Sequence, residues 1–182
     1  MLIRQTQASD FQRILDINAA EEEKTSRIDL ARITQLDLWS DYHRVAVMDD
    51  EVIGFLLVMS EISDYDGENF RWFVERYGCF LYIDRIVIDR TFGRRGVGNA
   101  LYSDLIKFAA TQSCSMLCCE INVLPPNPVS HAFHAGFGFV VFQDPWTGDV
   151  LTVFRCVGNR VVHVGNAAFI NQVDDQLHFV QT

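Results

Sequence analysis

Several features that would assign this 182-residue chain to a class of protein are missing from its sequence. No apolar run approaches the roughly 20 residues that a helix needs to cross a bilayer. The N-terminal stretch MLIRQTQASD also lacks the long apolar core of a secretory signal. These absences predict a cytoplasmic protein with no membrane partner.

Cysteine and basic residues give no sign of a metal or nucleic-acid site either. The five cysteines include no CxxC pair, so their spacing indicates neither a disulfide framework nor a zinc site, and we expect no metal. Cys118 and Cys119 stand in an apolar run and are interpreted as reduced core thiols. The net charge of −9 argues against nucleic acid and favours neutral or cationic partners.

The chain does have an ordinary globular composition, with 49% hydrophobic and 21% charged residues, which suits one domain with one core. Residue patterns predict a helix opened by a capping box at Ser9 and Gln12, a hairpin turn at 49–51, and a helix capped by Asn127. The expected strands are 2–6, 43–48, 52–59, 80–88, 116–123, 139–142 and 150–156, and a turn is expected at 145–148. Further helices are expected at 29–39, within 60–78, and from Gly96. This order indicates one α/β layer.

A turn rich in glycine and arginine lies between an expected strand and an expected helix. The stretch RTFGRRGVGNAL, residues 90–101, holds three glycines, which let a ligand approach the backbone, and two adjacent arginines, which suit phosphate. Free N–H groups at a helix start add partial positive charge, so the pattern predicts an anion site. The alternative is a plain connection with solvated arginines. Neither a P-loop nor a Rossmann fingerprint fits the spacing.

This turn and its neighbours resemble the GCN5-related N-acetyltransferase (GNAT) superfamily. The stretch IDRIVIDRTFGRRGVGNALYSDLIKFA is similar to its acyl-CoA motif, VMDDEVIGFLLV to the preceding hairpin, and EINVLPPNPVSHAFHAGFGF to the following strand and helix. The resemblance covers residues 1–156 and implies a single GNAT domain, with a mixed central sheet, splayed middle strands and helices on both faces. Residues 157–182 fall outside it, and their alternating pattern predicts an added strand or hairpin, packed on the domain or at a homodimer contact.

The resemblance also implies acetyl-CoA as a co-substrate. Its diphosphate would lie on the amides of the glycine-rich turn and its pantetheine arm along strand 80–88. Gly93 stands where the family has Gln or Arg, so Arg94 or Arg95 is expected to supply the lost contact. Asn127 matches an asparagine that contacts the arm, or is only a helix cap. The implied binding residues are Ile86, Val87, Ile88, Gly93, Arg94, Arg95, Gly96, Val97, Gly98 and Asn127.

Three residues are candidates for proton transfer in an N-acetyltransferase, in which a primary amine attacks the thioester directly. Glu120 is a carboxylate in an apolar strand, at a position where some family members carry a catalytic glutamate. Asp84 is the rival base, unless it pairs with an arginine. His134 takes the place of the family's tyrosine, so it either protonates the leaving thiolate or only hydrogen-bonds nearby.

The acceptor amine is not identified by the sequence. Acidic and aromatic residues on the expected acceptor side suit a small or cationic amine, although surface charges and core rings would look the same. They are Glu21, Glu22, Glu23, Asp64, Tyr65, Asp66, Glu68, Phe70, Trp72 and Phe73. Two other functions stay open: a non-catalytic acyl-CoA sensor, and a structural or assembly protein of the same fold.

Overall fold

The computed structural model describes residues 1–22, 25–112, 114, 116–122, 126–142, 150–156, 162–164, 167–170 and 178–181. Within these residues, seven strands form one sheet in the order β1-β2-β3-β4-β5-β7-β6. The strands are β1 (Leu2–Gln5), β2 (Tyr42–Met48), β3 (Glu51–Ser60), β4 (Leu81–Ile88), β5 (Met116–Asn122), β6 (Val140–Phe142) and β7 (Val150–Cys156). Among the described strands of this sheet, only β4 and β5 pair in parallel. The predicted mixed α/β sheet is confirmed.

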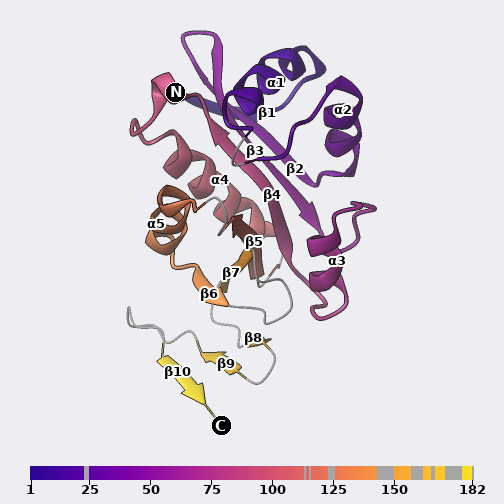
Figure 1. Cartoon of the computed structure of the whole chain (residues 1–182), viewed down its shortest axis with the longest axis vertical. Helices are drawn as coiled ribbons and strands as arrows, with labels where there is room; N and C mark the ends of the chain where they lie inside the picture. Colours follow the sequence, from indigo (N-terminus) through magenta and orange to yellow (C-terminus); the bar gives the residue numbers. More distant parts are fainter. Residues whose placement is uncertain are drawn as a thin grey trace.

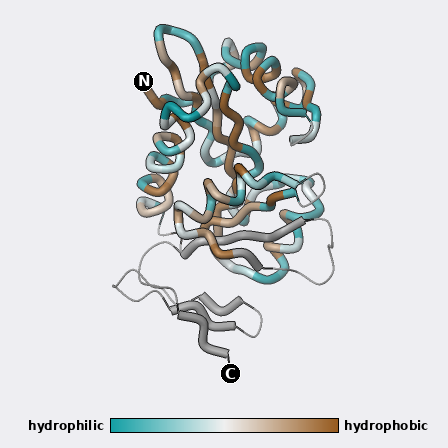
Figure 2. Tube along the Cα trace, turned by 60° about the vertical axis from the view of Figure 1, so that its left-hand side comes forward, coloured by the Kyte–Doolittle hydropathy of each residue, from teal (hydrophilic) through white to brown (hydrophobic). Residues whose placement is uncertain are grey.

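Helices cover both faces of this sheet (Figure 1). The helices α1 (Phe11–Ala20), α2 (Leu30–Trp39) and α3 (Glu68–Val74) pack on one face, and α4 (Val97–Thr111) and α5 (Pro128–Gly136) lie on the other. Figure 2 shows the central strands as hydrophobic and the outer turns of the helices as hydrophilic. None of the helices in the described part of the chain is long and apolar enough to cross a membrane.

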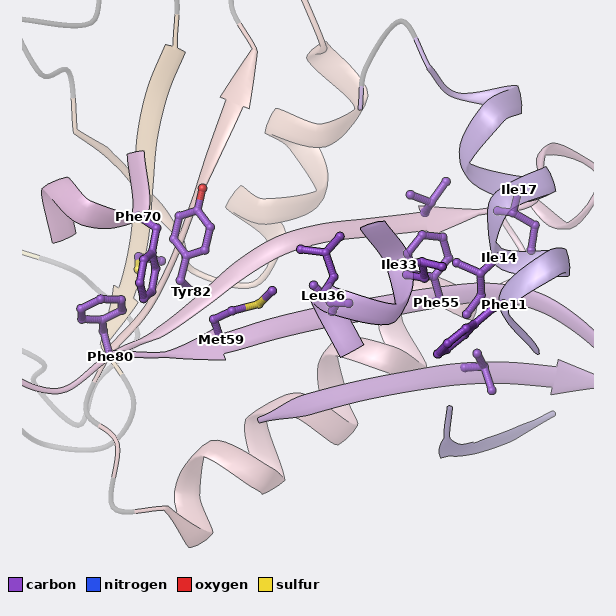
Figure 3. Close-up of a cluster of buried hydrophobic side chains, with 14 of the residues drawn as sticks. Phe11, Ile14, Ile17, Ile33, Leu36, Phe55, Met59, Phe70, Phe80 and Tyr82 are labelled. Carbon is purple, nitrogen blue, oxygen red and sulfur yellow. The ribbon is translucent and has the colours of Figure 1, made fainter. Parts of the chain in front are cut away.

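The core on the α1–α3 face shows why these segments fold together (Figure 3). Apolar residues at helical spacing, such as Ile14 in α1 and Ile33 in α2, are fully buried against Phe55 of β3. Further along the sheet, Phe70 of α3 meets Tyr82 of β4 at a ring-centroid distance of 5.5 Å. This second group places α3 beside the start of β4, next to the strand that holds Glu120.

The start of the first helix differs from the prediction. A 3-10 turn (Ala8–Asp10) precedes α1, and the capping contact runs from the Gln7 N–H to Asp10 Oδ2 at 2.8 Å. Asp10 takes this position because Arg4 holds its carboxylate through two hydrogen bonds of 2.7 and 2.9 Å. The predicted capping box at Ser9 and Gln12 is therefore wrong by two residues. The capping contact was shifted by an ion pair between residues six apart, which the capping-box pattern does not include.

The hairpin turn between β2 and β3 and the strands beyond residue 156 were also predicted from the sequence. Asp49 and Asp50, both with positive φ, form the expected hairpin turn between β2 and β3. The predicted turn at 145–148 lies outside the described residues. Beyond residue 156, β8 (Val162–Val164), β9 (Ala167–Ile170) and β10 (His178–Gln181) pair as an antiparallel sheet, so the segment does contain strands. Its role at a dimer contact stays a prediction.

The two parallel strands at the centre of the sheet diverge. Their ladder consists of Leu81 with Leu117 and Tyr82 with Cys118. Two residues later, β4 has a bulge: Ile83 and Arg85 pair with consecutive residues of β3, which leaves Asp84 as the extra residue. A bulge bends its strand and increases the local twist. The bulge therefore turns β4 away from β5 and opens the sheet where the sequence predicts the site.

Candidate active site

A cavity of about 570 Å³ occupies the opening between β4 and β5. Such a volume is typical of a small-molecule or cofactor site. Its walls come from β4, β5, the turn after β4 and the start of α5. The residues lining it include Ile83, Asp84, Arg85, Ile86, Val87, Ile88, Gly93, Arg94, Gly96, Val97, Gly98, Cys119, Glu120, Ile121, Asn122, Asn127, Ser130, Phe133 and His134. Nearly every predicted site residue is thus brought together.

The glycine-rich turn forms one end of this cavity. Gly96 is the N-cap of α4 and has a φ of 79°, a left-handed conformation that favours glycine. Arg94, also at positive φ, lines the cavity. The guanidinium of Arg95 instead lies over the ring of Phe92, 5.2 Å from its centroid. Of the two arginines, Arg94 is therefore the one placed to contact an anion at the helix N-terminus.

Gly98 has a different role from Gly96, because it lets α4 and α5 approach each other. A Cβ at this position would lie 3.0 Å from Cε2 of Phe133, whose ring also contacts Tyr102 at 4.8 Å. We expect Gly98→Ala to destabilise the fold by about 1–3 kcal/mol through overpacking, measured by urea denaturation. In the matched control Gly136→Ala, a helical glycine with open space around its Cβ, stability should stay unchanged or rise slightly. Equal losses in both variants would contradict this account.

Glu120 lies on β5 with its carboxylate largely buried in the cavity wall. Its Oε2 accepts hydrogen bonds from Asn69 Nδ2 of α3 and, at 3.5 Å, from the hydroxyl of Tyr82. Burial raises the pKa of Glu120 to about 7, and the charge of Asp84 raises it as well, while the two hydrogen bonds act in the opposite direction. A carboxylate with this pKa exchanges a proton readily at neutral pH.

Asp84 faces the same cavity but is held by other groups. Arg85 Nε lies 2.6 Å from Asp84 Oδ2, and both side chains are about 95% buried. The bulge explains this contact, because ordinary alternation would place neighbouring side chains on opposite faces. The hydroxyl of Tyr65 donates to Oδ1. Both carboxylate oxygens are engaged, so the ion pair that the sequence offered as the alternative role of Asp84 is present.

His134 is buried in α5 with both ring nitrogens in hydrogen bonds. Nδ1 lies 2.7 Å from the carbonyl oxygen of Ser130, so it carries the hydrogen and donates. Nε2 lies 2.6 Å from the hydroxyl of Tyr102 and therefore accepts. Desolvation lowers the pKa of His134, which keeps the imidazole neutral at pH 7. Of the two predicted roles, this arrangement favours hydrogen bonding over proton donation.

Asn127 and the partner residues of the catalytic candidates complete the site. The side-chain oxygen of Asn127 accepts from the Ser130 N–H at 3.1 Å, so it is the helix cap. Among the described residues its amide nitrogen has no hydrogen-bond partner, so it can donate to a ligand. Sequence reasoning missed Asn69 and Tyr102, which hold Glu120 and His134. No sequence signal marks these partners, because they lie 51 and 32 residues away along the chain.

The acidic and aromatic residues predicted on the acceptor side mostly have structural roles. Asp66 pairs with Arg32 at 2.6 Å, and Glu21 pairs with Arg90. Phe70 and Phe73 are core residues, and Trp72 packs under a guanidinium. Glu23 lies outside the described residues. Among the described members of this set, only Glu21 lines the main cavity. Whether they contact a cationic acceptor stays a prediction.

Comparisons with known proteins agree with this geometry. The profile of the acetyltransferase (GNAT) family matches residues 9–139. The chain belongs to the GNAT family. Members of this family use acetyl-CoA, so the expected co-substrate is confirmed at the level of the family. No curated protein matches the sequence.

Solved GNAT structures share the fold of this chain at low sequence identity. Ard1 from Thermoplasma volcanium is 21% identical with a TM-score of 0.66, covering 86% of this chain and 97% of its own. A ribosomal-protein-alanine N-acetyltransferase from Brucella melitensis is also 21% identical, with a TM-score of 0.64 and coverage of 86% and 99%. The structure of yncA from Salmonella typhimurium, which contains its cofactor acetyl-CoA, is 19% identical, with a TM-score of 0.67 and coverage of 91% and 98%.

The residues present in the cavity fit acetyl-CoA. The turn offers bare backbone at Gly96 and the cation of Arg94 for the phosphates, and the divergent strands leave an apolar slot that suits the pantetheine arm. By contrast, the described residues hold no group of three histidine, cysteine or acidic side chains that could bind a metal ion.

Proposed function

We propose that this protein is an N-acetyltransferase that moves an acetyl group from acetyl-CoA to a primary amine, with Glu120 as the base. The observation that supports it most strongly is the buried Glu120 carboxylate. Its pKa is raised to about 7, and it lines the cavity between β4 and β5. Asp84, fixed by Arg85 and Tyr65, is assigned to the structure of that wall rather than to proton transfer.

Glu120 would prepare the amine for attack. Amines are mostly protonated at pH 7, so a proton must leave before the nitrogen can act as a nucleophile. Asn69 and Tyr82 both bind Oε2, which fixes the carboxylate and leaves Oε1 to receive that proton. Acetyl-CoA, when bound, supplies an activated acetyl thioester. A backbone N–H of Val87 or Ile88 would polarise its carbonyl group.

His134 is assigned a positioning role in this proposal. Its neutral ring ties α5 to Tyr102 of α4, which keeps Asn127 and Ser130 at the cavity wall. We expect His134→Ala to change kcat and acetyl-CoA affinity together, because the α5 wall as a whole would shift. A loss confined to kcat would instead restore the role of proton donor.

The direct test is release of the CoA thiol during incubation with acetyl-CoA and a panel of amines. The panel should include small amines, diamines and short peptides with a free N-terminus. The peptides are chosen because the Brucella neighbour is named for the alanine of a ribosomal protein. We expect at least one amine to raise thiol release above the hydrolysis background. Release from no amine would leave only the binding function described below.

The pH dependence of kcat/KM provides a second test with an amine found in this way. Glu120 accepts a proton only when ionised, so kcat/KM should rise about tenfold per pH unit below 7 and bend near pH 7. With a second acceptor whose amine has a different pKa, the part of the kcat/KM profile that reflects ionisation of the amine should shift. The bend near pH 7 should stay in place. Absence of any bend between pH 6 and 8 with both acceptors would contradict Glu120 as the base.

A non-catalytic acyl-CoA sensor is the second candidate. The observation that favours it is His134, which replaces the family's tyrosine and has no ring nitrogen available for proton donation. A sensor would show a thermal shift with acetyl-CoA and no thiol release with any amine. An assembly protein would show neither response.

A further inference from the structure

A second, smaller cavity of about 170 Å³ lies near the N-terminal ends of β4 and β5, away from the candidate active site. It contains two of the described cysteines, together with acidic and apolar residues. The residues lining it are Asp41, Ser60, Glu61, Ile62, Cys79, Phe80, Leu81, Phe108, Gln112 and Cys114. None of them lines the main cavity.

The sheet brings these two cysteines together. Cys79 lies two residues before the first residue of β4, and Cys114 lies two residues before the first residue of β5. The strands are paired in parallel at this end, with Leu81 beside Leu117, and neighbouring strands are roughly 4.8 Å apart. Both thiols line the second cavity, close enough for the Cys79 sulfur to affect the pKa of Cys114, and Cys114 Sγ donates to the carbonyl oxygen of Met116 at 3.3 Å.

We propose that Cys79 and Cys114 form a dithiol site that a small, cationic disulfide oxidises to an intramolecular disulfide bond. In the first step, the Cys79 thiolate attacks the reagent, which forms a mixed disulfide and releases one thiol. In the second step, the Cys114 thiolate attacks the Cys79 sulfur and releases the second thiol. The protein loses two protons and two electrons, which together equal two hydrogen atoms, and the reagent disulfide is reduced to two thiols.

The environment of each thiol sets the order of these steps. Cys79 is exposed, whereas Cys114 is buried, so a reagent reaches Cys79 first. Burial, together with the neighbouring Cys79 sulfur, raises the pKa of Cys114 to about 12. Cys114 is therefore the thiol that acts second, on the mixed disulfide at Cys79. Asp41 and Glu61 line the same cavity and should attract a cationic reagent.

The proposal is tested on the reduced full-length chain with cystamine, a cationic disulfide. Intact-mass analysis should show loss of two hydrogen atoms, and peptide mapping should find Cys79 joined to Cys114. Cys114→Ala should stop at a stable mixed disulfide on Cys79, and Cys79→Ser should not react. The oxidised chain should also melt about 5 °C or more above the reduced chain, because the bond closes a long loop.

Three results would overturn the proposal: a mixed disulfide that persists in the wild type, a crosslink to any other cysteine, or no reaction at all. Glutathione disulfide, which is anionic, is the comparison reagent. It should react more slowly than cystamine at low salt, and the difference should shrink as salt screens Asp41 and Glu61. None of these readouts requires acetyl transfer, so the dithiol site can fail or hold independently of the proposed function.

Discussion

Glu120→Gln is expected to lower kcat by about 10²–10⁴-fold and, at the same time, to stabilise the protein at pH 8. The loss of activity follows because an amide cannot accept the proton of the amine. The gain in stability follows from the raised pKa, because ionising Glu120 costs more free energy in the folded protein than in the unfolded chain. The difference between the ordinary value of 4.5 and about 7 corresponds to at most about 3 kcal/mol.

The direction of the stability effect depends on pH. Below about pH 4.5 the carboxyl group is protonated in both the folded and unfolded states, so no ionisation cost exists. As pH rises through 7, the folded state also loses the proton and the cost is complete. Glu120→Gln should therefore melt well above the wild type at pH 8 and close to it at pH 5.

A surface glutamate provides the matched control for this experiment. Glu75, at the end of α3, is exposed, and Glu75→Gln should leave both the melting temperature and kcat almost unchanged. If Glu120→Gln kept full activity, a residue other than Glu120 would be the base. A variant that is inactive and also destabilised at pH 8 would show that Glu120 supports the fold rather than the chemistry.

Arg85→Met is expected to destabilise the protein by about 3–5 kcal/mol, which is a large part of the stability of a domain. The guanidinium of Arg85 is buried and donates to Asp84 Oδ2, to Asn18 Oδ1 at 3.0 Å and to Ser26 at 3.2 Å. Removing it leaves the buried Asp84 with an uncompensated charge. Urea denaturation measures the loss.

A second substitution separates the charge from the packing. If the unpaired Asp84 is the cause, Asp84→Asn combined with Arg85→Met should be clearly more stable than Arg85→Met alone. Arg85→Lys, which keeps the charge but loses the planar donors, should lie between wild type and Arg85→Met. A double variant no more stable than the single one would assign the loss to packing and contradict the ion-pair account.

The same network ties the end of α1 to the cavity wall. Asn18 accepts from Thr25 Oγ1 at 3.3 Å, and Thr25 and Glu21 both line the main cavity. Arg85 therefore connects the bulged strand to the segment that follows α1. This arrangement explains how one side of the cavity keeps its shape although it is formed by a loop.

The features that could be predicted from the sequence are those determined by neighbouring residues. Gly96 marks the turn because glycine favours a left-handed conformation and a helix N-terminus has local signals, and Asn127 caps its helix as its position before Pro128 indicates. The apolar periodicity likewise identified the central strands and helices. The family resemblance then placed acetyl-CoA and Glu120 in one site.

The features that could not be predicted depend on contacts between distant segments. The bulge at Asp84 is set by the register of β4 against β3, and this register allows the contact with Arg85. The amide of Asn69 reaches Glu120 only because aromatic residues pack α3 onto β4. Arg95 lies over Phe92 whereas its neighbour Arg94, with positive φ, lines the cavity, and this difference has no local sequence signal.

Calorimetric titration of the protein with acetyl-CoA tests the central claim that the gap between β4 and β5, closed by the turn at 93–98, is an acyl-CoA site. Acetyl-pantetheine, which lacks the diphosphate, serves as the matched ligand. We expect one acetyl-CoA per chain, bound at least about tenfold more tightly than acetyl-pantetheine, because the helix N-terminus and Arg94 contact the phosphates. No uptake of acetyl-CoA at millimolar concentration, or equal affinity for the two ligands, would contradict the account.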